Sequence, residues 1–317
     1  MAVPCTIIMA ATVLTALMPP IYCLEETREP SRDPRRHGEN MQTPRRDLPI
    51  VEETREPSRD PRRHRENMET PRRDLPIVNS GSFPLNIGCD AVDDMYDGCT
   101  EEMKDKVEKK YFKKENKKIF KYVWTKCSEK KYSDNEALAK NHMLAICAYT
   151  SNSGKKANDK KLYDEFNKAV RTSRNFYGSS SKFKFHYLHY WLTTAIQILN
   201  RNQGCQTTYR KTKDEFTGKV KQIMRFGAFA SSSKRTNIKT FGSKTCFKIE
   251  TCSGAYLNPY SEHPSEEEVL IPPYETFNIT DITEGRSNPQ GLNDCEKVFV
   301  LKSVGEVSNL NCKLAAK

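Results

Sequence analysis

Three neighbouring carboxylates and three neighbouring hydroxyls are the groups in this chain best placed to carry out chemistry. Glu266–Glu268 run directly into the apolar segment Val269–Ile271, which two prolines end. Acidic side chains at the edge of a buried strand are unfavourable unless they are paired or used in a site. Ser231–Ser233 precede them, and Tyr209–Arg210 lie further upstream. An arginine can bind a phosphate through two hydrogen bonds, and a carboxylate can stabilise a positive charge. The stretch therefore indicates a site, and the alternative is a solvated acidic loop.

The pattern around these groups predicts helices first and strands second. From Thr207 onward, β-branched and aromatic segments alternate with Gly, Pro and Asn, which is typical of strands and turns. Before that point, apolar residues recur at helical spacing, and the last helix is largely apolar and expected to be buried. These segments are 101–131, 136–149, 160–174 (stripe Leu162, Phe166 and Val170) and 183–199. The order indicates an α+β fold.

Two features of the helical half could indicate a ligand: a lysine-dense segment, which could bind nucleic acid, and a pair of histidines, which could bind a metal. The segment 101–131 is dense in lysine, and we interpret it as a solvated helical face. It carries no base-stacking pattern, so specific nucleic-acid binding is not expected. His186 and His189 stand three residues apart among aromatic residues, without a third ligand in view. Packed histidines are therefore favoured over a metal site, and no metal is expected.

Composition limits the class of protein. The 317 residues suffice for two average domains, or for one large domain with a tail. With 29% charged residues, the chain is not a membrane-embedded protein. Only 36% of residues are hydrophobic, which indicates that part of the chain is not packed. The net charge of +11 suggests acidic neighbours such as phosphates, a nucleotide, a glycosaminoglycan or an anionic membrane.

The first quarter of the chain shows two distinct segments. An apolar run from Val3 to Leu17 has the length of a signal sequence, and residues 1–23 are predicted to be removed on secretion. Eleven cysteines agree with an oxidising, extracellular destination. Residues 25–51 recur almost unchanged as 52–78, and in each copy arginines and acidic residues balance. Four prolines and few apolar residues per copy predict that 24–78 is a disordered spacer. Residues 79–317 then form the folded domain.

Several motifs in one order carry a resemblance to a known family. Tyr209-Arg210, the FxSxS pattern that begins at Phe229, and the ExE of Glu266–Glu268 before VLIPP resemble arginine-specific mono-ADP-ribosyltransferases of the vertebrate ecto-enzyme, toxin-like type. Further stretches look like family landmarks, and together they cover roughly residues 85 to 315: DDMYDGCTEEM, AICAYT, CxxxxYR and SNLNC. The resemblance implies that 79–317 is a catalytic domain with the β-sheet core of that family.

The resemblance also implies a reaction. Family members cleave NAD, their co-substrate, between nicotinamide and ribose, and pass ADP-ribose to an arginine of a protein. Arg210 would bind the pyrophosphate, Ser231 the ribose, and Glu268 would stabilise the developing cation. Glu266 would receive the acceptor guanidinium. Alternate residues of an extended segment share a face, so Glu266 and Glu268 are expected to face one cleft. Further NAD contacts are implied at Tyr149, Phe241 and Ser261, beside Arg210 and Ser231.

Two positions depart from the family pattern. Lys211 stands where relatives commonly have glycine, and Ala228 where they often have glutamine. Either change is expected to weaken NAD binding.

The expected protein is a secreted transferase. The rivals are an NAD glycohydrolase and a catalytically weakened, secreted basic binding protein. For the repeat, three roles are open. It is a flexible spacer, its exposed arginines are self-modification sites, or it is an arm that binds glycosaminoglycans. The chain end SNLNCKLAAK has no hydrophobic tail, so a lipid anchor is not expected.

Cysteines and one sequon complete the expectations. The resemblance implies the disulfides Cys205–Cys252 and Cys99–Cys312. Pairing of the others is open: Cys89 with Cys295, and Cys127 with Cys147, would leave Cys246 as an odd thiol. Asn278-Ile279-Thr280 is the glycosylation sequon, and we expect it on a loop after a strand.

Overall fold

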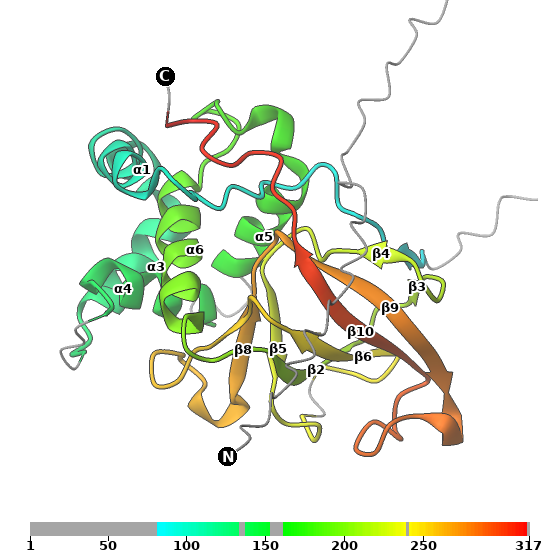
Figure 1. Cartoon of the computed structure of the whole chain (residues 1–317). Coiled ribbons are helices and arrows are strands. Elements are labelled where there is room, and N and C mark those ends of the chain that lie inside the picture. Colours follow the sequence, from blue (N-terminus) through cyan, green and yellow to red (C-terminus); the bar gives the residue numbers. More distant parts are fainter. Residues whose placement is uncertain (1–80, 133–136, 153–160, 239–240, 316–317) are drawn as a thin grey trace, which may run out of the picture. The chain divides into compact units, whose positions relative to one another are not determined.

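The computed structural model describes residues 81–132, 137–152, 161–238 and 241–315 (Figure 1). The predicted signal sequence, 1–23, and the predicted spacer, 24–78, lie outside the described residues.

Helices occupy the first half of the described chain. Their bounds are α1 (Thr100–Lys106), the π-helical turn η1 (Val107–Tyr111), α2 (Phe112–Glu115), α3 (Lys118–Ser128), α4 (Lys140–Thr150), α5 (Leu162–Thr172), the 3-10 turn η2 (Arg174–Phe176) and α6 (His186–Asn200). The helical path of the lysine-dense segment 101–131 is interrupted at the start of α3, where Lys118 has a φ of 52°. Leu162, Phe166 and Val170 of α5 are buried, as their spacing predicts.

Strands occupy the second half. Eight of them form one sheet in the order β4-β9-β10-β6-β2-β5-β8-β7, and the pair β10–β6 is parallel while the other pairs are antiparallel. The α+β class predicted from the sequence is confirmed. The bounds are β2 (Gln206–Thr212), β4 (Ile223–Met224), β5 (Ala230–Ser233), β6 (Thr245–Thr251), β7 (Ala255–Tyr256), β8 (Glu268–Ile271), β9 (Glu275–Glu284) and β10 (Lys297–Glu306), with β1 (Phe83–Pro84) and β3 (Phe216–Thr217) forming a separate pair and η3 (Pro264–Glu266) and η4 (Gly285–Ser287) as 3-10 turns.

The sheet separates two hydrophobic cores. Leu270 of β8 belongs to the core that the helices share, while the next residue, Ile271, belongs to a second core with Phe247 and Phe299. Successive side chains of a strand point to opposite faces, so a strand buried on both sides is apolar throughout. In Figure 1 the helices lie beside β8 and β5, the strands that carry Glu268 and the three serines.

Four disulfides join described residues. Cys99–Cys312 and Cys205–Cys252 are the pairs that the family resemblance implies, and Cys127–Cys147 joins α3 to α4. The alternative Cys89–Cys295 is wrong because Cys295 bonds to Cys246, with Cα atoms 6.1 Å apart. Because Cys246 is bonded to Cys295, it is not an odd thiol, and Cys89 is disulfide-bonded as well. Residue 246 lies on β6, and its partner lies in the loop before β10, so only the fold brings them together.

The glycosylation sequon does not lie on a loop. Asn278 is in the middle of β9, where it pairs with Ile223 on one side and Lys302 on the other. Its side-chain oxygen Oδ1 is buried. The residue is partly buried within a paired strand, so the expectation of a sequon on a loop is wrong.

The two histidines of α6 are packed, as predicted. His186 is fully buried, and its Nδ1 lies 2.6 Å from Oε1 of Glu115 while its Nε2 lies 2.6 Å from the carbonyl oxygen of Tyr177. His189 is also fully buried, with its Nδ1 2.6 Å from the hydroxyl of Tyr96. Both imidazole rings therefore make their hydrogen bonds to groups inside the core.

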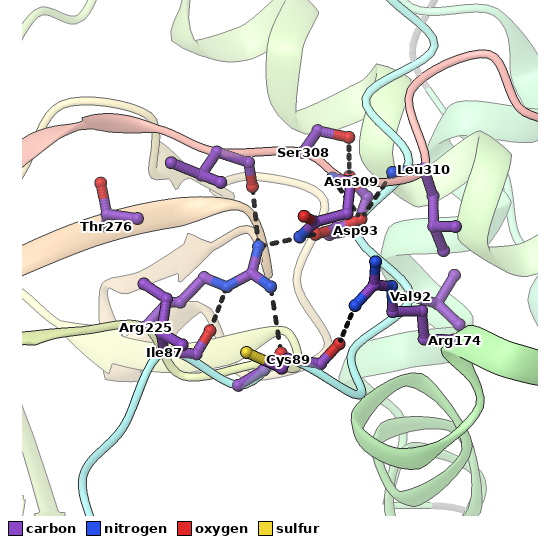
Figure 2. Close-up of polar contacts among 12 residues, drawn as sticks. Ile87, Cys89, Val92, Asp93, Arg174, Arg225, Thr276, Ser308, Asn309 and Leu310 are labelled. Carbon is purple, nitrogen blue, oxygen red and sulfur yellow. Dashed lines mark hydrogen bonds and ion pairs between the residues drawn. The ribbon is translucent and has the colours of Figure 1, made fainter. Parts of the chain in front are cut away.

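A buried ion pair holds the two ends of the domain together (Figure 2). The guanidinium of Arg225 donates from Nη1 to Oδ2 of Asp93 at 2.7 Å and to the carbonyl oxygen of Val307 at 2.7 Å. It also donates to the carbonyl oxygens of Ile87 and Gly88. Asp93 further accepts from the backbone N–H groups of residues 309 and 310. The side chains of Asp93 and Arg225 are both fully buried.

We expect the change Arg225→Met to destabilise the domain by about 3–5 kcal/mol, because it leaves the buried charge of Asp93 without its cation. Urea unfolding followed by fluorescence measures this loss. The matched control is Lys109→Met, since Lys109 pairs with Asp105 at the exposed surface, and there we expect almost no change. Equal stability of the two variants would show that the buried pair contributes little.

Candidate active site

Three strands bring the predicted site residues side by side. The sheet order places β2, β5 and β8 next to one another, and these strands carry Arg210, Ser231 and Glu268. Nη1 of Arg210 donates to the carbonyl oxygen of Ser231 at 2.6 Å. Arg210, Ser231 and Glu268 all line one cleft beside these strands. The order of β2, β5 and β8 in space thus joins motifs that are about 20 to 60 residues apart in the sequence.

Glu268 is a buried carboxylate with two hydroxyl partners. It begins β8, and only 6% of its surface is exposed. Ser261 donates from Oγ to its Oε2 at 3.1 Å, and the side chain of Ser231 also hydrogen-bonds to it. Burial raises the pKa of Glu268 above that of an ordinary glutamate, and the two serines oppose this rise because they favour the ionised form. Nearby Glu266 raises the pKa of Glu268 further.

Glu266 faces the same cleft as Glu268, but for a different reason than the one predicted. The segment is not extended: Glu266 ends the 3-10 turn η3, and Glu267 has the left-handed φ of 46°. Glu266 and Glu268 line the cleft, whereas the described lining does not include Glu267. The expected arrangement therefore holds, and it is the left-handed residue between them, not strand alternation, that produces it.

The end of β5 fixes the turn that carries these carboxylates. Oγ of Ser233 donates to the carbonyl oxygen of Glu266 at 2.5 Å, and the N–H of Lys234 donates to that of Glu267 at 3.1 Å. Nη1 of Arg235 donates to the carbonyl oxygen of Ser265 at 2.8 Å. The three hydrogen bonds hold the backbone of the turn, so that the side chain of Glu266 is presented from a supported position.

The remaining predicted contacts differ in their surroundings. Tyr149, on α4, lines the cleft, and burial raises the pKa of Tyr149 to about 12, so its hydroxyl stays protonated at neutral pH. Phe241 lines the cleft with 48% of its surface exposed. Ser261 is outside the described lining and lies behind Glu268, whose carboxylate it supports. A direct contact of Ser261 with NAD stays a prediction.

Several lining residues were not predicted. Nδ2 of Asn167, on α5, donates to the hydroxyl of Tyr149 at 3.0 Å, and that hydroxyl donates to the carbonyl oxygen of Phe229 at 3.1 Å. Spacing contained a signal, because Tyr163 and Asn167 stand four apart beside the buried stripe of α5. The other lining residues, from separate segments, include Asn152, Lys161, Arg235, Thr236, Ile238 and His263.

The two departures from the family pattern are both buried. The ammonium of Lys211 lies 2.8 and 2.9 Å from the two carboxylate oxygens of Asp294, and 5% of its side chain is exposed. Ala228 is 1% exposed and belongs to the core of the helices, so it offers no side-chain contact to a ligand in the cleft. The expected weakening of NAD binding at both positions stays a prediction.

The described residues show neither a cluster of metal ligands nor a membrane-spanning helix. They contain no group of three or more His, Cys, Asp or Glu side chains that could hold a metal ion. Among the helices of the described ranges, none is long and apolar enough to cross a membrane.

The sequence is similar to proteins of known family. Residues 85–297 match the family described as NAD:arginine ADP-ribosyltransferase. Ecto-ADP-ribosyltransferase 5 of Bos taurus is 32% identical over 256 residues, which are 72% of this chain and 77% of that protein. T-cell ecto-ADP-ribosyltransferase 2 of Mus musculus is 35% identical over 242 residues, 73% of this chain and 77% of that protein.

The fold is similar to solved structures as well. The crystal structure of the eukaryotic mono-ADP-ribosyltransferase ART2.2 superposes with a TM-score of 0.57 and 30% identity, covering 73% of this chain and 99% of that one. A mutant of the same enzyme in complex with NAD gives a TM-score of 0.56, with the same identity and coverage.

Proposed function

This chain belongs to the NAD:arginine ADP-ribosyltransferase family, and we propose that it is a secreted enzyme that transfers ADP-ribose from NAD to arginine side chains of proteins. It is a mono-ADP-ribosyltransferase of the ecto-enzyme type, with NAD as its substrate. Arginine as acceptor, secretion and the roles of individual residues are the parts that we propose.

Arg210 and Ser231 would hold the phosphates and ribose of NAD. A guanidinium offers five N–H donors in a planar fork, and Arg210 uses one of them on the carbonyl oxygen of Ser231. Burial lowers the pKa of Arg210 from its usual value, but an arginine remains protonated at neutral pH. A half-buried cation in a cleft suits a pyrophosphate. The hydroxyl of Ser231, already bound to Glu268, would orient the ribose beside that carboxylate.

Glu268 would stabilise positive charge as the bond from nicotinamide to ribose breaks. The ribose becomes oxocarbenium-like in such a reaction, and a fixed carboxylate beside it lowers the barrier. The two serine hydroxyls hold the carboxylate of Glu268 in place before the substrate arrives. No reorganisation of this group is then needed during the reaction.

The position of Glu266 is the observation that supports arginine as the acceptor. Its carboxylate lines the same cleft as Glu268, on a turn that Ser233 and Arg235 hold by the backbone. A second carboxylate at this place can bind an incoming guanidinium and take its proton. Water as acceptor, which would make the protein an NAD glycohydrolase, requires no such group.

Nicotinamide release from NAD, measured with and without the arginine analogue agmatine, tests the proposal. We expect release to rise with agmatine and ADP-ribosyl-agmatine to accumulate. Release without transfer would identify an NAD glycohydrolase, and no release at all would identify a binding protein on this fold.

The pH dependence of kcat/KM provides a second test, because it reports the free enzyme. Glu268 acts as an anion, and its pKa is raised above the ordinary value of 4.5. The active form is therefore lost as the pH falls through a midpoint above 4.5. We expect an acid limb there, measured by nicotinamide release under conditions in which the protein remains folded. If kcat/KM stays constant down to pH values below 4.5, the ordinary pKa of a glutamate, the assigned role of Glu268 is contradicted.

Secretion is supported by the disulfides and by the named relatives. Four disulfides join described residues, and such bonds persist in oxidising compartments. The relatives are described as ecto-enzymes. Recovery of the disulfide-bonded chain from the medium of expressing cells, beginning near residue 24, would support secretion. Retention inside the cell would contradict it.

A further inference from the structure

A large excess of positive charge lies outside the cleft, along α1 to α3 and the three residues that follow them. Residues 104–131 contain twelve lysines, no arginine and four acidic residues, an excess of eight positive charges in a chain whose net charge is +11. The acidic residue in the centre of this stretch, Glu115, does not face solvent. It is 5% exposed and binds His186 at 2.6 Å and the N–H of Tyr187 at 3.0 Å. Lys104 and Lys130 pair with Glu101 and Glu262, which lie outside this stretch, so most but not all of the lysine excess remains unbalanced at the surface.

Five lysines in the centre of this stretch form what we call the lysine surface: Lys113, Lys114, Lys117, Lys118 and Lys121. All five are exposed, and none has a side-chain partner among the described residues. Lys109, by contrast, pairs with Asp105 at 2.6 Å. The five lysines lie within nine residues of one another, and like charges repel, so an anionic ligand that neutralises several of them at once would be favoured.

The backbone that carries these lysines is held by the core. Tyr111, which ends η1, is buried, and so are Phe120, Val123 and Trp124 of α3. Trp124 packs against the ring of Tyr187 on α6, with ring centroids 5.3 Å apart. The ammonium groups therefore extend from a fixed support, and binding a ligand would not require this part of the chain to become ordered.

Three kinds of polyanion could bind here: a nucleic acid, an anionic membrane and a hydrophilic anionic polymer. The residues around the lysine surface distinguish between them. The aromatic rings of the stretch are buried or partly buried in the core, so the lysine surface offers no platform for stacking bases. The large hydrophobic side chains exposed in the described ranges are Phe83, Phe176, Val220, Phe241 and Val304. None of them belongs to α1, α2 or α3, so nothing there would insert into a membrane. A hydrophilic polymer of anions fits best.

We propose that the lysine surface binds a sulfated polysaccharide of the heparin type. Lysine ammonium groups act as point charges and accept sulfates in many orientations, without the planar geometry that arginine favours. The described residues that line the cleft begin at Tyr149, and none comes from α1 to α3. Binding would therefore hold the enzyme at a sulfated surface while the cleft stays open, a role separate from the proposed transfer reaction.

The test uses the full chain and heparin. In the charge-reversal variant, Lys113, Lys114, Lys117 and Lys121 are all replaced by Glu, while Lys118 is kept because its φ is positive. In about 0.15 M salt we expect heparin affinity to fall by at least about tenfold, with a shallower salt dependence, since fewer counterions are released. The same four positions changed to Gln provide a milder variant. NAD hydrolysis should be unchanged in both, which checks the fold.

The matched control reverses four exposed lysines elsewhere: Lys168, Lys184, Lys219 and Lys313. It changes the net charge by the same amount, and we expect heparin affinity to fall by less than about threefold. Equal losses in the two variants would overturn the proposal, because the effect would then be one of net charge alone. Heparin without sulfate groups should bind weakly to the wild type and show no difference between variants.

Two further ligands test the choice of partner. Vesicles that contain phosphatidylserine, and single-stranded DNA, are compared with heparin at equal charge concentration. We expect weaker binding of both than of heparin. If either binds as tightly as heparin and loses affinity in the charge-reversal variant, the lysine surface is not selective for a sulfated polysaccharide and the proposal fails.

Discussion

Glu268→Gln is expected to lower the turnover of NAD by a factor on the order of 10²–10³, because it removes one preorganised charge from the site. The amide keeps the shape of the side chain, so both transfer and hydrolysis should fall while NAD affinity changes much less. Nicotinamide release gives the turnover, and calorimetry or fluorescence titration gives the affinity.

Glu267→Gln is the matched control for this change. Glu267 is the neighbouring residue, and it is not among the described residues that line the cleft. We expect its turnover to stay within about twofold of the wild type, since surface charges outside a site contribute little. Near-normal turnover in a folded Glu268→Gln protein would contradict the proposed stabilisation of the ribosyl cation.

Glu266→Ala is expected to abolish transfer to arginine while preserving much of the NAD hydrolysis. A guanidinium has a pKa above about 12 and is a poor nucleophile while protonated, so the acceptor needs a carboxylate to orient it and take its proton. Water needs this help far less. Glu266 lines the cleft beside Glu268, but its turn is held independently by Ser233 and Arg235. The change should therefore leave Glu268 in position.

The ratio of ADP-ribosyl-agmatine to free ADP-ribose measures this effect within one sample. Glu266→Gln separates charge from shape, and we expect it to lose transfer as well. Hydrolysis that persists in both variants shows that they are folded. Equal loss of transfer and hydrolysis would place Glu266 in the NAD-cleaving apparatus, and unimpaired transfer would show that the arginine specificity does not depend on this residue.

The sequence by itself determined which groups are available and in which kind of element they lie. The stripe Leu162, Phe166 and Val170 predicted α5, and the apolar run after Glu268 predicted the buried strand β8. These are local properties, because burial imposes a period on a helix and removes polar residues from a central strand. The ordered motifs added the family and, through it, the disulfides Cys99–Cys312 and Cys205–Cys252.

The tertiary structure decided how those groups meet. Pairing between distant strands brings β2, β5 and β8 together, and no local pattern specifies that order. It also determined the partner of Cys246 and put the sequon into β9. At the site, the hydrogen bonds from Ser233 and Arg235 fold the carboxylate segment into a turn with a left-handed Glu267. Strand alternation predicted the shared cleft for the wrong reason, because contacts with another strand determine the backbone of a turn.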